Sequence, residues 1–296
     1  MGYLVGVTGL WAFSFSLIGA YLAGQVDSYF AVLVRVSLAA LVFLPLLRPR
    51  LLQGKKRLAL MAVGALQLGV MYLFFYSSFL LLSVPEVLLF TVLTPLYIAL
   101  LDDALFGRFT PLYLLTALLA VAGAAVIRYD GVSGDFWLGF GVVQGANLCF
   151  ALGQVGYRRL AATLPASLAW HSVFGWFFLG ALAVALPAFW LLGDASALPQ
   201  TSTQWLVLLW LGLAASGGGY FLWNRGAVRV NAGVLAIMNN ALVPAGLVVN
   251  LLLWNREAEL DRLALGGAII AASLWLNQRY YHRNRRRPAG QGAGRA

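Results

Sequence analysis

Residues Leu235–Trp254 read LAIMNNALVPAGLVVNLLLW, an apolar run long enough to cross a lipid bilayer. Two adjacent amides, Asn239 and Asn240, interrupt the run near its middle, and Pro244 follows them. A buried amide without a hydrogen-bond partner costs about 1–3 kcal/mol, so both side chains need partners inside the membrane. Pro244 removes a backbone donor and favours a kink. Two interpretations are open: polar contacts between packed helices, or a substrate site in a water-accessible cavity.

The composition of the whole chain is typical of a helical membrane protein with many spans. Of the 296 residues, 61% are hydrophobic and 10% are charged, and the mean hydropathy is +0.83. A soluble domain carries about 25% charged residues, and β-barrel strands would alternate instead of forming continuous apolar runs. No basic segment precedes the first apolar run, so we expect no cleavable signal sequence. The single cysteine, Cys149, lies inside an apolar run and is expected in the core.

Ten apolar segments predict an all-α integral membrane protein with ten transmembrane helices. Ten spans put both termini on one side of the membrane, and the positive-inside rule selects the cytoplasm. Sixteen lysines and arginines then fall inside, three fall outside, and Arg35 lies within a span. The net charge of +10 is therefore a topology signal and not a nucleic-acid patch. The segments are Tyr3–Ala23, Tyr29–Leu47, Leu58–Leu82, Val84–Phe106, Leu112–Ile127, Phe136–Tyr157, Leu168–Leu192, Gln204–Trp223, Ala232–Trp254 and Leu263–Tyr281.

The sequence also contains an internal repeat. Leu115–Ile127 aligns with Leu263–Trp275 at an offset of 148 residues, and an offset of 149 places Pro95 over Pro244. We interpret these two prolines as hinges, because each falls inside a predicted span. The repeat divides the chain into two five-span units of opposite orientation, since an odd number of spans inverts the second unit. Inverted repeats are typical of secondary transporters that bind substrate near the midplane.

The predicted domain organisation follows from the repeat. Residues 1–130 form the first five-helix unit and residues 135–283 the second, inverted unit. Residues 284–296 are rich in arginine and glycine, and we expect a disordered cytoplasmic tail there.

No catalytic or metal-binding pattern is recognisable in the sequence, so we predict no enzyme and no cofactor. The two histidines, His171 and His282, are far apart, and no phosphate-cradling or metal-ligand spacing occurs. Asp102 and Asp103 fall within about two turns of the end of the fourth span. We expect them at the membrane interface with Arg108 as a partner, instead of in a proton relay.

Amides and aromatic side chains gather in spans one, three, four, six, eight and nine. Aromatic walls with a few amides suit an uncharged or mostly uncharged organic solute and do not suit a bare ion. Arg35 is the exception, since an intramembrane arginine is costly and marks a functional site by default. It either snorkels or pairs with backbone carbonyls, or it meets an anionic substrate. The predicted substrate-binding residues are Trp11, Phe15, Arg35, Tyr72, Tyr76, Thr94, Asn147, Tyr220, Trp223, Asn239 and Asn240.

With these features the chain resembles the EamA family of the drug/metabolite transporter superfamily, from about Tyr3 to Tyr281. The tryptophan motif of the family's first span matches Leu10–Ser14, and its arginine near the start of the second span matches Arg35. Where the family ends span four with Leu-Gly-Glu, this chain has Phe106–Arg108, so a role for that glutamate does not carry over. The resemblance implies two inverted five-span repeats and a cavity lined by the six spans named above.

Within the family, four strings are similar to the bacterial biotin importer branch: Tyr21–Gly24, Asp27–Val36, Leu89–Tyr97 and Ile237–Asn240. The resemblance implies an inner-membrane transporter that takes up biotin by alternating access. The amides would then pair with the ureido group, and Arg35 with the carboxylate. The alternatives are an exporter of amino acids or related metabolites, and a non-transporting membrane sensor. The expected partners are a small-molecule substrate and the lipid bilayer, and a homo-oligomer is left open.

Overall fold

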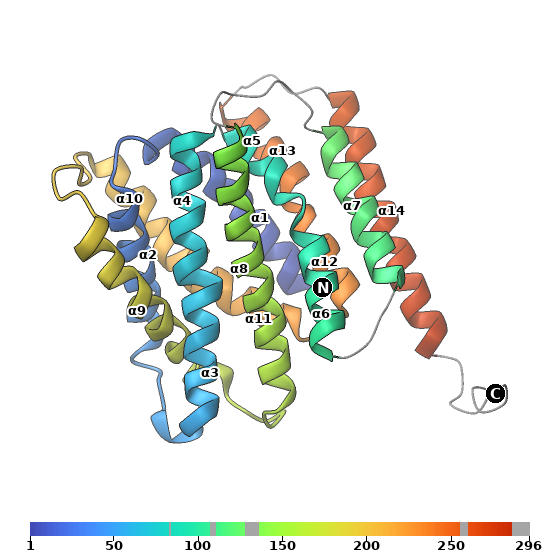
Figure 1. The fold of residues 1–296 in the computed structure, drawn as a ribbon, viewed down its shortest axis with the longest axis horizontal. Helices are drawn as coiled ribbons and strands as arrows, with labels where there is room; N and C mark the ends of the chain where they lie inside the picture. Colours follow the sequence, from blue (N-terminus) through green and yellow to red (C-terminus); the bar gives the residue numbers. More distant parts are fainter. Residues whose placement is uncertain (83, 107–110, 128–135, 255–259, 286–296) are drawn as a thin grey trace.

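The computed structural model describes residues 1–82, 84–106, 111–127, 136–254 and 260–285 as a bundle of helices (Figure 1). No residue in these ranges lies in a β-strand. The α-helices are α1 (Gly2–Tyr21), α2 (Ser28–Phe43), α3 (Gly54–Gly64), α4 (Met71–Leu81), α5 (Val84–Thr91), α6 (Thr94–Phe106), α7 (Pro111–Ile127), α8 (Phe136–Ala162), α9 (Gly175–Leu192), α10 (Ser202–Trp210), α11 (Gly219–Ala227), α12 (Ala232–Asn240), α13 (Leu242–Trp254) and α14 (Leu260–Arg285).

Each predicted apolar segment coincides with a helix or with consecutive helices. The segment predicted as Leu168–Leu192 needs a correction, because α9 begins at Gly175 and is preceded by the short 3-10 helix Trp170–Ser172. Among the described residues, five helical runs are long and apolar enough to cross a membrane: Gly2–Tyr21, Gly54–Leu81, Trp137–Ala162, Trp170–Leu192 and Ser202–Ala227.

The outer surface of the bundle is apolar. Side chains such as Trp190, Trp137 and Leu252 are 83%, 79% and 74% exposed. A contiguous apolar surface of this kind is unfavourable in water, whereas it is favourable in contact with lipid tails. The protein is therefore a multi-pass membrane protein.

Two long helical runs contain a π-helix at corresponding places. Ala65–Val70 joins α3 to α4, and Leu211–Gly218 joins α10 to α11. The offset of 148 found in the sequence maps 65–70 onto 213–218, inside the second π-helix. π-Helices occur frequently at functional sites because they widen a turn and redirect side chains.

Two helical runs are broken just before a proline. Helix α5 ends at Thr91, four residues before Pro95, and α12 ends at Asn240, four residues before Pro244. Proline has no N–H for the carbonyl four residues earlier, and its ring collides with that carbonyl. The predicted hinge prolines thus lie in the first turns of α6 and α13, and each break lies upstream of its proline.

Helices that are distant in sequence pack against one another. The main pairs are α7 with α14, α2 with α9, α4 with α8, α1 with α13, and α6 with α12. Figure 1 shows α7 and α14 side by side, with the end of α7 beside the start of α14. Glycines allow the closest approach, because a Cβ atom on Gly64 or Gly180 would lie 1.8 Å from a backbone carbonyl oxygen of the facing helix.

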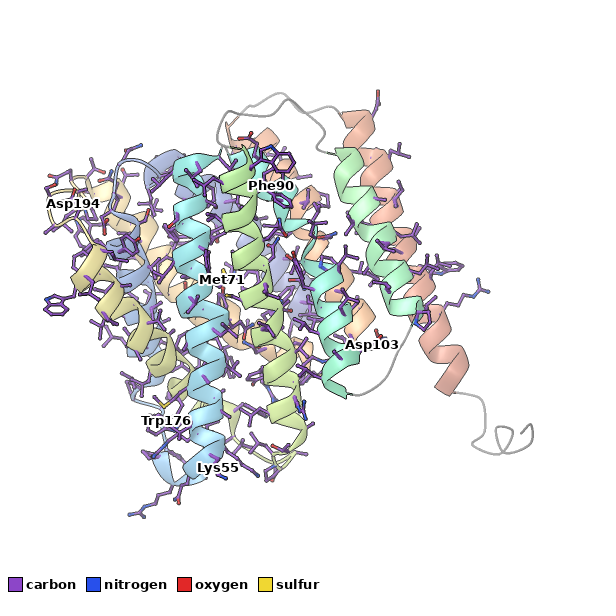
Figure 2. All side chains as sticks on the ribbon, viewed as in Figure 1. Lys55, Met71, Phe90, Asp103, Trp176 and Asp194 are labelled. Carbon is purple, nitrogen blue, oxygen red and sulfur yellow. The ribbon has the colours of Figure 1, made fainter. Side chains whose placement is uncertain are left out.

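The bundle has two ends, which Figure 2 marks by Lys55 and Asp194. We call them the Lys55 end and the Asp194 end. Helix α3 begins at the Lys55 end, and α8 runs toward it from the Asp194 end (Figure 1).

Candidate functional site

A cavity of about 90 Å³ lies inside the bundle, where α1, α2, α4, α8 and α11 surround the two helix breaks. We call it the central cavity. Nine of the eleven predicted substrate-binding residues line it, and Tyr76 and Asn240 do not. The lining residues are Thr8, Trp11, Ser14, Phe15, Arg35, Met71, Tyr72, Phe75, Thr91, Thr94, Ala146, Asn147, Phe150, Tyr220, Trp223, Asn239 and Leu242.

Arg35 on α2 is 2% exposed, and its guanidinium group donates hydrogen bonds to three hydroxyl groups. Nε lies 3.1 Å from Ser216 Oγ, Nη1 lies 3.0 Å from the Tyr76 hydroxyl, and Nη2 lies 2.5 Å from the Tyr72 hydroxyl. The guanidinium carbon also lies 4.3 Å from the centre of the Tyr72 ring. Arg35 therefore does not snorkel, and it donates to no backbone carbonyl within the described ranges.

The hydrogen-bond partners of the Arg35 guanidinium group are neutral hydroxyl groups. Within the described ranges no carboxylate forms an ion pair with it. A buried charge without a counter-ion is unfavourable, and an anion that enters the cavity would compensate it. Arg35 is thus suited to bind a carboxylate.

Tyr76 and Ser216 position Arg35 from outside the central cavity. Tyr76 accepts a hydrogen bond from Nη1 and does not line the cavity, so in this structure it contacts the arginine, and its contact with substrate stays a prediction. Ser216, in the second π-helix, lies 2.9 Å from the Tyr72 hydroxyl and was not predicted. A single serine in an apolar run has no sequence pattern that would have identified it.

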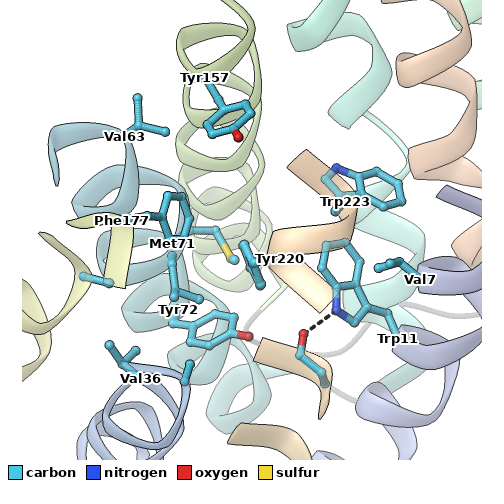
Figure 3. Close-up of a cluster of buried hydrophobic side chains, with 14 of the residues drawn as sticks. Val7, Trp11, Val36, Val63, Met71, Tyr72, Tyr157, Phe177, Tyr220 and Trp223 are labelled. Atoms are coloured by element: carbon cyan, nitrogen blue, oxygen red, sulfur yellow. Dashed lines mark hydrogen bonds between the residues drawn. The ribbon is translucent and has the colours of Figure 1, made fainter. Parts of the chain in front are cut away.

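Aromatic rings form one wall of the central cavity (Figure 3). The ring of Trp11 lies 4.9 Å from Trp223, 5.1 Å from Tyr220 and 5.9 Å from Phe150, measured between ring centres. The indole N–H of Trp11 donates a 2.8 Å hydrogen bond to the carbonyl oxygen of Ala215, drawn as a dashed line in Figure 3. The rings therefore present apolar faces to the cavity. The hydrogen bond between Trp11 and Ala215, which are distant in the chain, fixes the orientation of the Trp11 ring.

The amide of Asn147 offers an acceptor to the central cavity. Its Nδ2 donates to the carbonyl of Phe90 at 2.8 Å and to Gln144 Oε1 at 3.0 Å. Its Oδ1 accepts no hydrogen bond from any residue that the structure describes. The hydroxyl of Ser14 is likewise buried without a partner among the described residues. Both oxygens can accept N–H groups of a ligand.

The two adjacent asparagines have different roles. Asn239 lines the central cavity and exchanges hydrogen bonds of 3.2 and 3.3 Å with the amide of Gln154, which also accepts one from Trp223 Nε1 at 3.0 Å. Asn240 is 1% exposed, and its Nδ2 donates to the Val92 carbonyl at 3.1 Å. Consecutive helical side chains point about 100° apart, so only one of the two faces the cavity. In this structure Asn239 is the one that does, and a contact of Asn240 with substrate stays a prediction.

Several lining residues were not predicted as binding residues. They are Thr8, Ser14, Met71, Phe75, Thr91, Ala146, Phe150 and Leu242. Most follow or precede a predicted residue by three positions, as Phe150 follows Asn147 and Leu242 follows Asn239. Side chains three or four residues apart share one face of a helix, and applying this rule to the predicted residues would have found them.

An ion pair lies between the central cavity and the Lys55 end. Arg158 Nη1 on α8 lies 2.6 Å from Asp102 Oδ1 on α6, and the carboxylate is fully buried. The expected partner, Arg108, lies outside the described residues, and the interface position expected for Asp102 is replaced by a buried one. Among the described residues no group of three metal-ligand side chains occurs.

Comparisons with known proteins add independent observations. The model of the EamA-like transporter family matches residues 1–129. A relative from Pseudomonas aeruginosa named "Probable biotin transporter" is 59% identical over 94% of this chain and 97% of its own length. The "Biotin transporter" proteins of Salmonella typhimurium and Escherichia coli are each 53% identical over 95% of this chain and 93% of their own length. One crystal structure matches with a TM-score of 0.75 and 21% identity, over 95% of this chain and 98% of the other, which supports the fold.

Proposed function

The chain belongs to the EamA-like transporter family, and we propose that it takes up biotin across the cytoplasmic membrane by alternating access. The observation that carries the proposal is Arg35, a buried cation without a described carboxylate partner in a cavity walled by aromatic rings. Relatives that are 53–59% identical over nearly the whole chain are named as biotin transporters or a probable one.

The chemistry of biotin fits the central cavity group by group. Its carboxylate would meet the guanidinium group of Arg35, in a charge-assisted pair that is stronger than a neutral hydrogen bond. Its sulfur-containing ring is apolar and would lie against the aromatic wall around Trp11. Its ureido group has two N–H donors, for which Asn147 Oδ1 and Ser14 Oγ supply open acceptors.

The central cavity has to widen to admit such a solute. Its volume of about 90 Å³ is smaller than the roughly 300–1,000 Å³ of typical ligand pockets. Toward the Asp194 end the rings of Phe15 and Phe75 pack at 5.2 Å, in a cluster with Leu82 and Leu88. Toward the Lys55 end lie the Gln154 amide network and the Asp102–Arg158 pair. Alternating access requires that one of these two sets of contacts opens while the other stays closed.

We propose further that the chain crosses the membrane ten times, as two inverted repeats of residues 1–130 and 135–283. The equivalent positions of the two π-helices and of the two helix breaks support the repeat. The packing also supports it, because exchanging the halves turns the pair α4–α8 into α11–α1, and both pairs are in contact. The charge distribution in the sequence supports a cytoplasmic location for both termini.

The experiment that tests the proposal is uptake of labelled biotin into proteoliposomes that contain the purified protein. We expect saturable uptake by the wild type, and Arg35→Gln should weaken uptake of biotin far more than uptake of the neutral biotin amide. Arg35→Lys keeps the positive charge but lacks the planar guanidinium group with its paired donors. It should therefore weaken biotin uptake by an intermediate amount. An absence of saturable biotin uptake by the wild type would overturn the substrate, and equal losses for both solutes would make Arg35 structural.

A further inference from the structure

A second cavity, of about 460 Å³, lies where α8 and α11 approach the Lys55 end. We call it the vestibule. Its walls are the end of α8 from Arg158 to Ala162, residues 164–166, the indole of Trp170, and the end of α11 with Arg225. Its volume falls within the range of about 300–1,000 Å³ that is typical of ligand sites.

The two arginines of the vestibule differ in how they are bonded. Arg158 is held by Asp102 and by the carbonyl of Val230, at 2.6 and 3.3 Å. Arg225 is half-buried, and its guanidinium carbon lies 5.7 Å from the centre of the Trp170 ring. It makes no hydrogen bond to any residue within the described ranges. No Asp or Glu of the described part of the chain lines the vestibule. Arg225 therefore presents unused donors in a positive pocket, an arrangement suited to a carboxylate.

The vestibule lies directly beyond the central cavity on the same two helices. Phe150 of α8 lines the central cavity and Arg158 lines the vestibule, a separation of about 12 Å at the rise of an α-helix. On α11, Trp223 lines the first cavity and Arg225 the second. The wall between the cavities contains the Gln154 amide, bonded to Trp223.

A buried polar group without a partner lies beside the vestibule. Tyr157 is fully buried, and its hydroxyl has no hydrogen-bond partner among the described residues. Its ring lies 5.1 Å from the ring of Trp170, which lines the vestibule. A buried hydroxyl without a partner costs free energy, so it favours any state in which a polar ligand passes it.

From these observations we infer that the vestibule is a second substrate site, in which Arg225 binds the carboxylate of the transported solute on the cytoplasmic side of the closed wall. This inference rests on the proposed function, because the sidedness and the carboxylate come from it. Arg35 holds the carboxylate in the central cavity, and Arg225 holds it once the Gln154 network and the Asp102–Arg158 pair have parted. Trp170 supplies an apolar face for the rest of the solute.

The test compares the two faces of the membrane. Right-side-out and inside-out vesicles from cells that produce the full chain are given labelled biotin or biotin amide, and the half-saturating concentration is measured at each face. For Arg225→Gln we expect a rise of about tenfold for biotin at the cytoplasmic face, the change that a loss of about 1.4 kcal/mol produces. Biotin at the external face, and biotin amide at both faces, should change less than twofold. Arg225→Lys should recover most of the loss.

The matched control is Arg229→Gln, which removes a charge one turn further along the chain. Arg229 is exposed, lies 4.8 Å from the Tyr3 ring and does not line the vestibule, so its loss should change no half-saturating concentration. Equal effects of the two variants, equal losses for both solutes, or no effect of Arg225→Gln would overturn the inference while leaving biotin uptake by the wild type intact. Absence of saturable transport by the wild type would overturn the proposed function as well.

A lipid phosphate is the competing anion at this face. Proteoliposomes of phosphatidylcholine alone, and of phosphatidylcholine with phosphatidylglycerol, separate the two sources. We expect the effect of Arg225→Gln on biotin in both lipid compositions. An effect that appears only when phosphatidylglycerol is present would assign Arg225 to a lipid headgroup and overturn the solute site.

Discussion

The indole Nε1 of Trp11 donates a hydrogen bond of 2.8 Å to the carbonyl oxygen of Ala215, a residue 204 positions later in the chain. Ala215 lies within the π-helix Leu211–Gly218, so the bond ties the first helix to the widened turn of a helix in the second half. Trp11 is also the ring from which the aromatic wall extends. The shape of the wall therefore depends on the space beside this π-helix.

The first prediction concerns the space between Trp11 and this π-helix. A Cβ atom on Gly219 would lie 2.7 Å from Trp11 Nε1, whereas one on Gly218 would meet only the carbonyl of Leu213 at 3.9 Å. We expect Gly219→Ala to displace the indole, to raise the half-saturating concentration for biotin about tenfold and to lower the thermal midpoint. Gly218→Ala, the control, should keep uptake and retain or gain stability, since alanine restricts the unfolded chain. Identical behaviour of the two variants would contradict this account of the wall.

The second prediction separates the adjacent asparagines. Asn239→Ala should weaken biotin binding by about tenfold, because it removes an amide that lines the central cavity. Asn240→Ala should leave affinity near the wild-type value and lower the free energy of unfolding by about 1–2 kcal/mol, because it leaves the Val92 carbonyl without its donor. Equilibrium binding of labelled biotin and unfolding in detergent would measure the two effects. A reversed pattern would show that the rotation of α12 differs in the binding state.

The sequence predicted those features of the fold and of the site that depend on residues close together in the chain. Pro95 and Pro244 predicted interruptions because a proline disrupts the bond to the carbonyl four residues earlier, and the helices end at those positions. Arg35 was identifiable because a charge in an apolar run is unfavourable without a function or a partner. Residues three positions from the predicted ones, such as Phe150, could also have been found from helical spacing alone.

The remaining features of the site depend on contacts between residues that are far apart in the chain, and the sequence alone did not predict them. Asp102 pairs with Arg158, 56 positions away, whereas the sequence suggested the nearby Arg108. Ser216 lies in the π-helix Leu211–Gly218 and meets Arg35 of α2, 181 positions earlier in the chain. Which asparagine faces the central cavity depends on the rotation of α12 against its neighbours, and a pair of identical amides contains no information about that rotation.

The third prediction concerns membrane topology. In a Cys149→Ser background, Ala195→Cys at the Asp194 end should react with an impermeant maleimide in intact cells. Lys55→Cys, at the opposite end of the bundle, should react only after the membrane is permeabilised (Figure 2). The reason is the excess of lysine and arginine in the connections predicted inside. Labelling of Lys55→Cys, but not of Ala195→Cys, in intact cells would invert the orientation.

The last prediction concerns the ion pair beside the vestibule. Asp102 is fully buried and Arg158 is 13% exposed, so the two single variants should differ. Arg158→Gln leaves a buried carboxylate facing a neutral amide and should lower the free energy of unfolding by about 3 kcal/mol. Asp102→Asn should cost less, about 1–2 kcal/mol, because the guanidinium group keeps its bond to the Val230 carbonyl and some contact with water.

The double variant and a neighbouring arginine test whether the two charges stabilise each other. Replacing both partners removes the unpaired charge that either single change leaves, so the double variant should be less destabilised than the sum of the two. Arg159→Gln is the control, since that side chain is exposed and bonds only the Leu105 carbonyl at 2.9 Å among the residues described; it should change stability by less than about 0.5 kcal/mol. Strict additivity would mean that the two charges do not stabilise each other, and the pair could not then help to hold the Lys55 end closed.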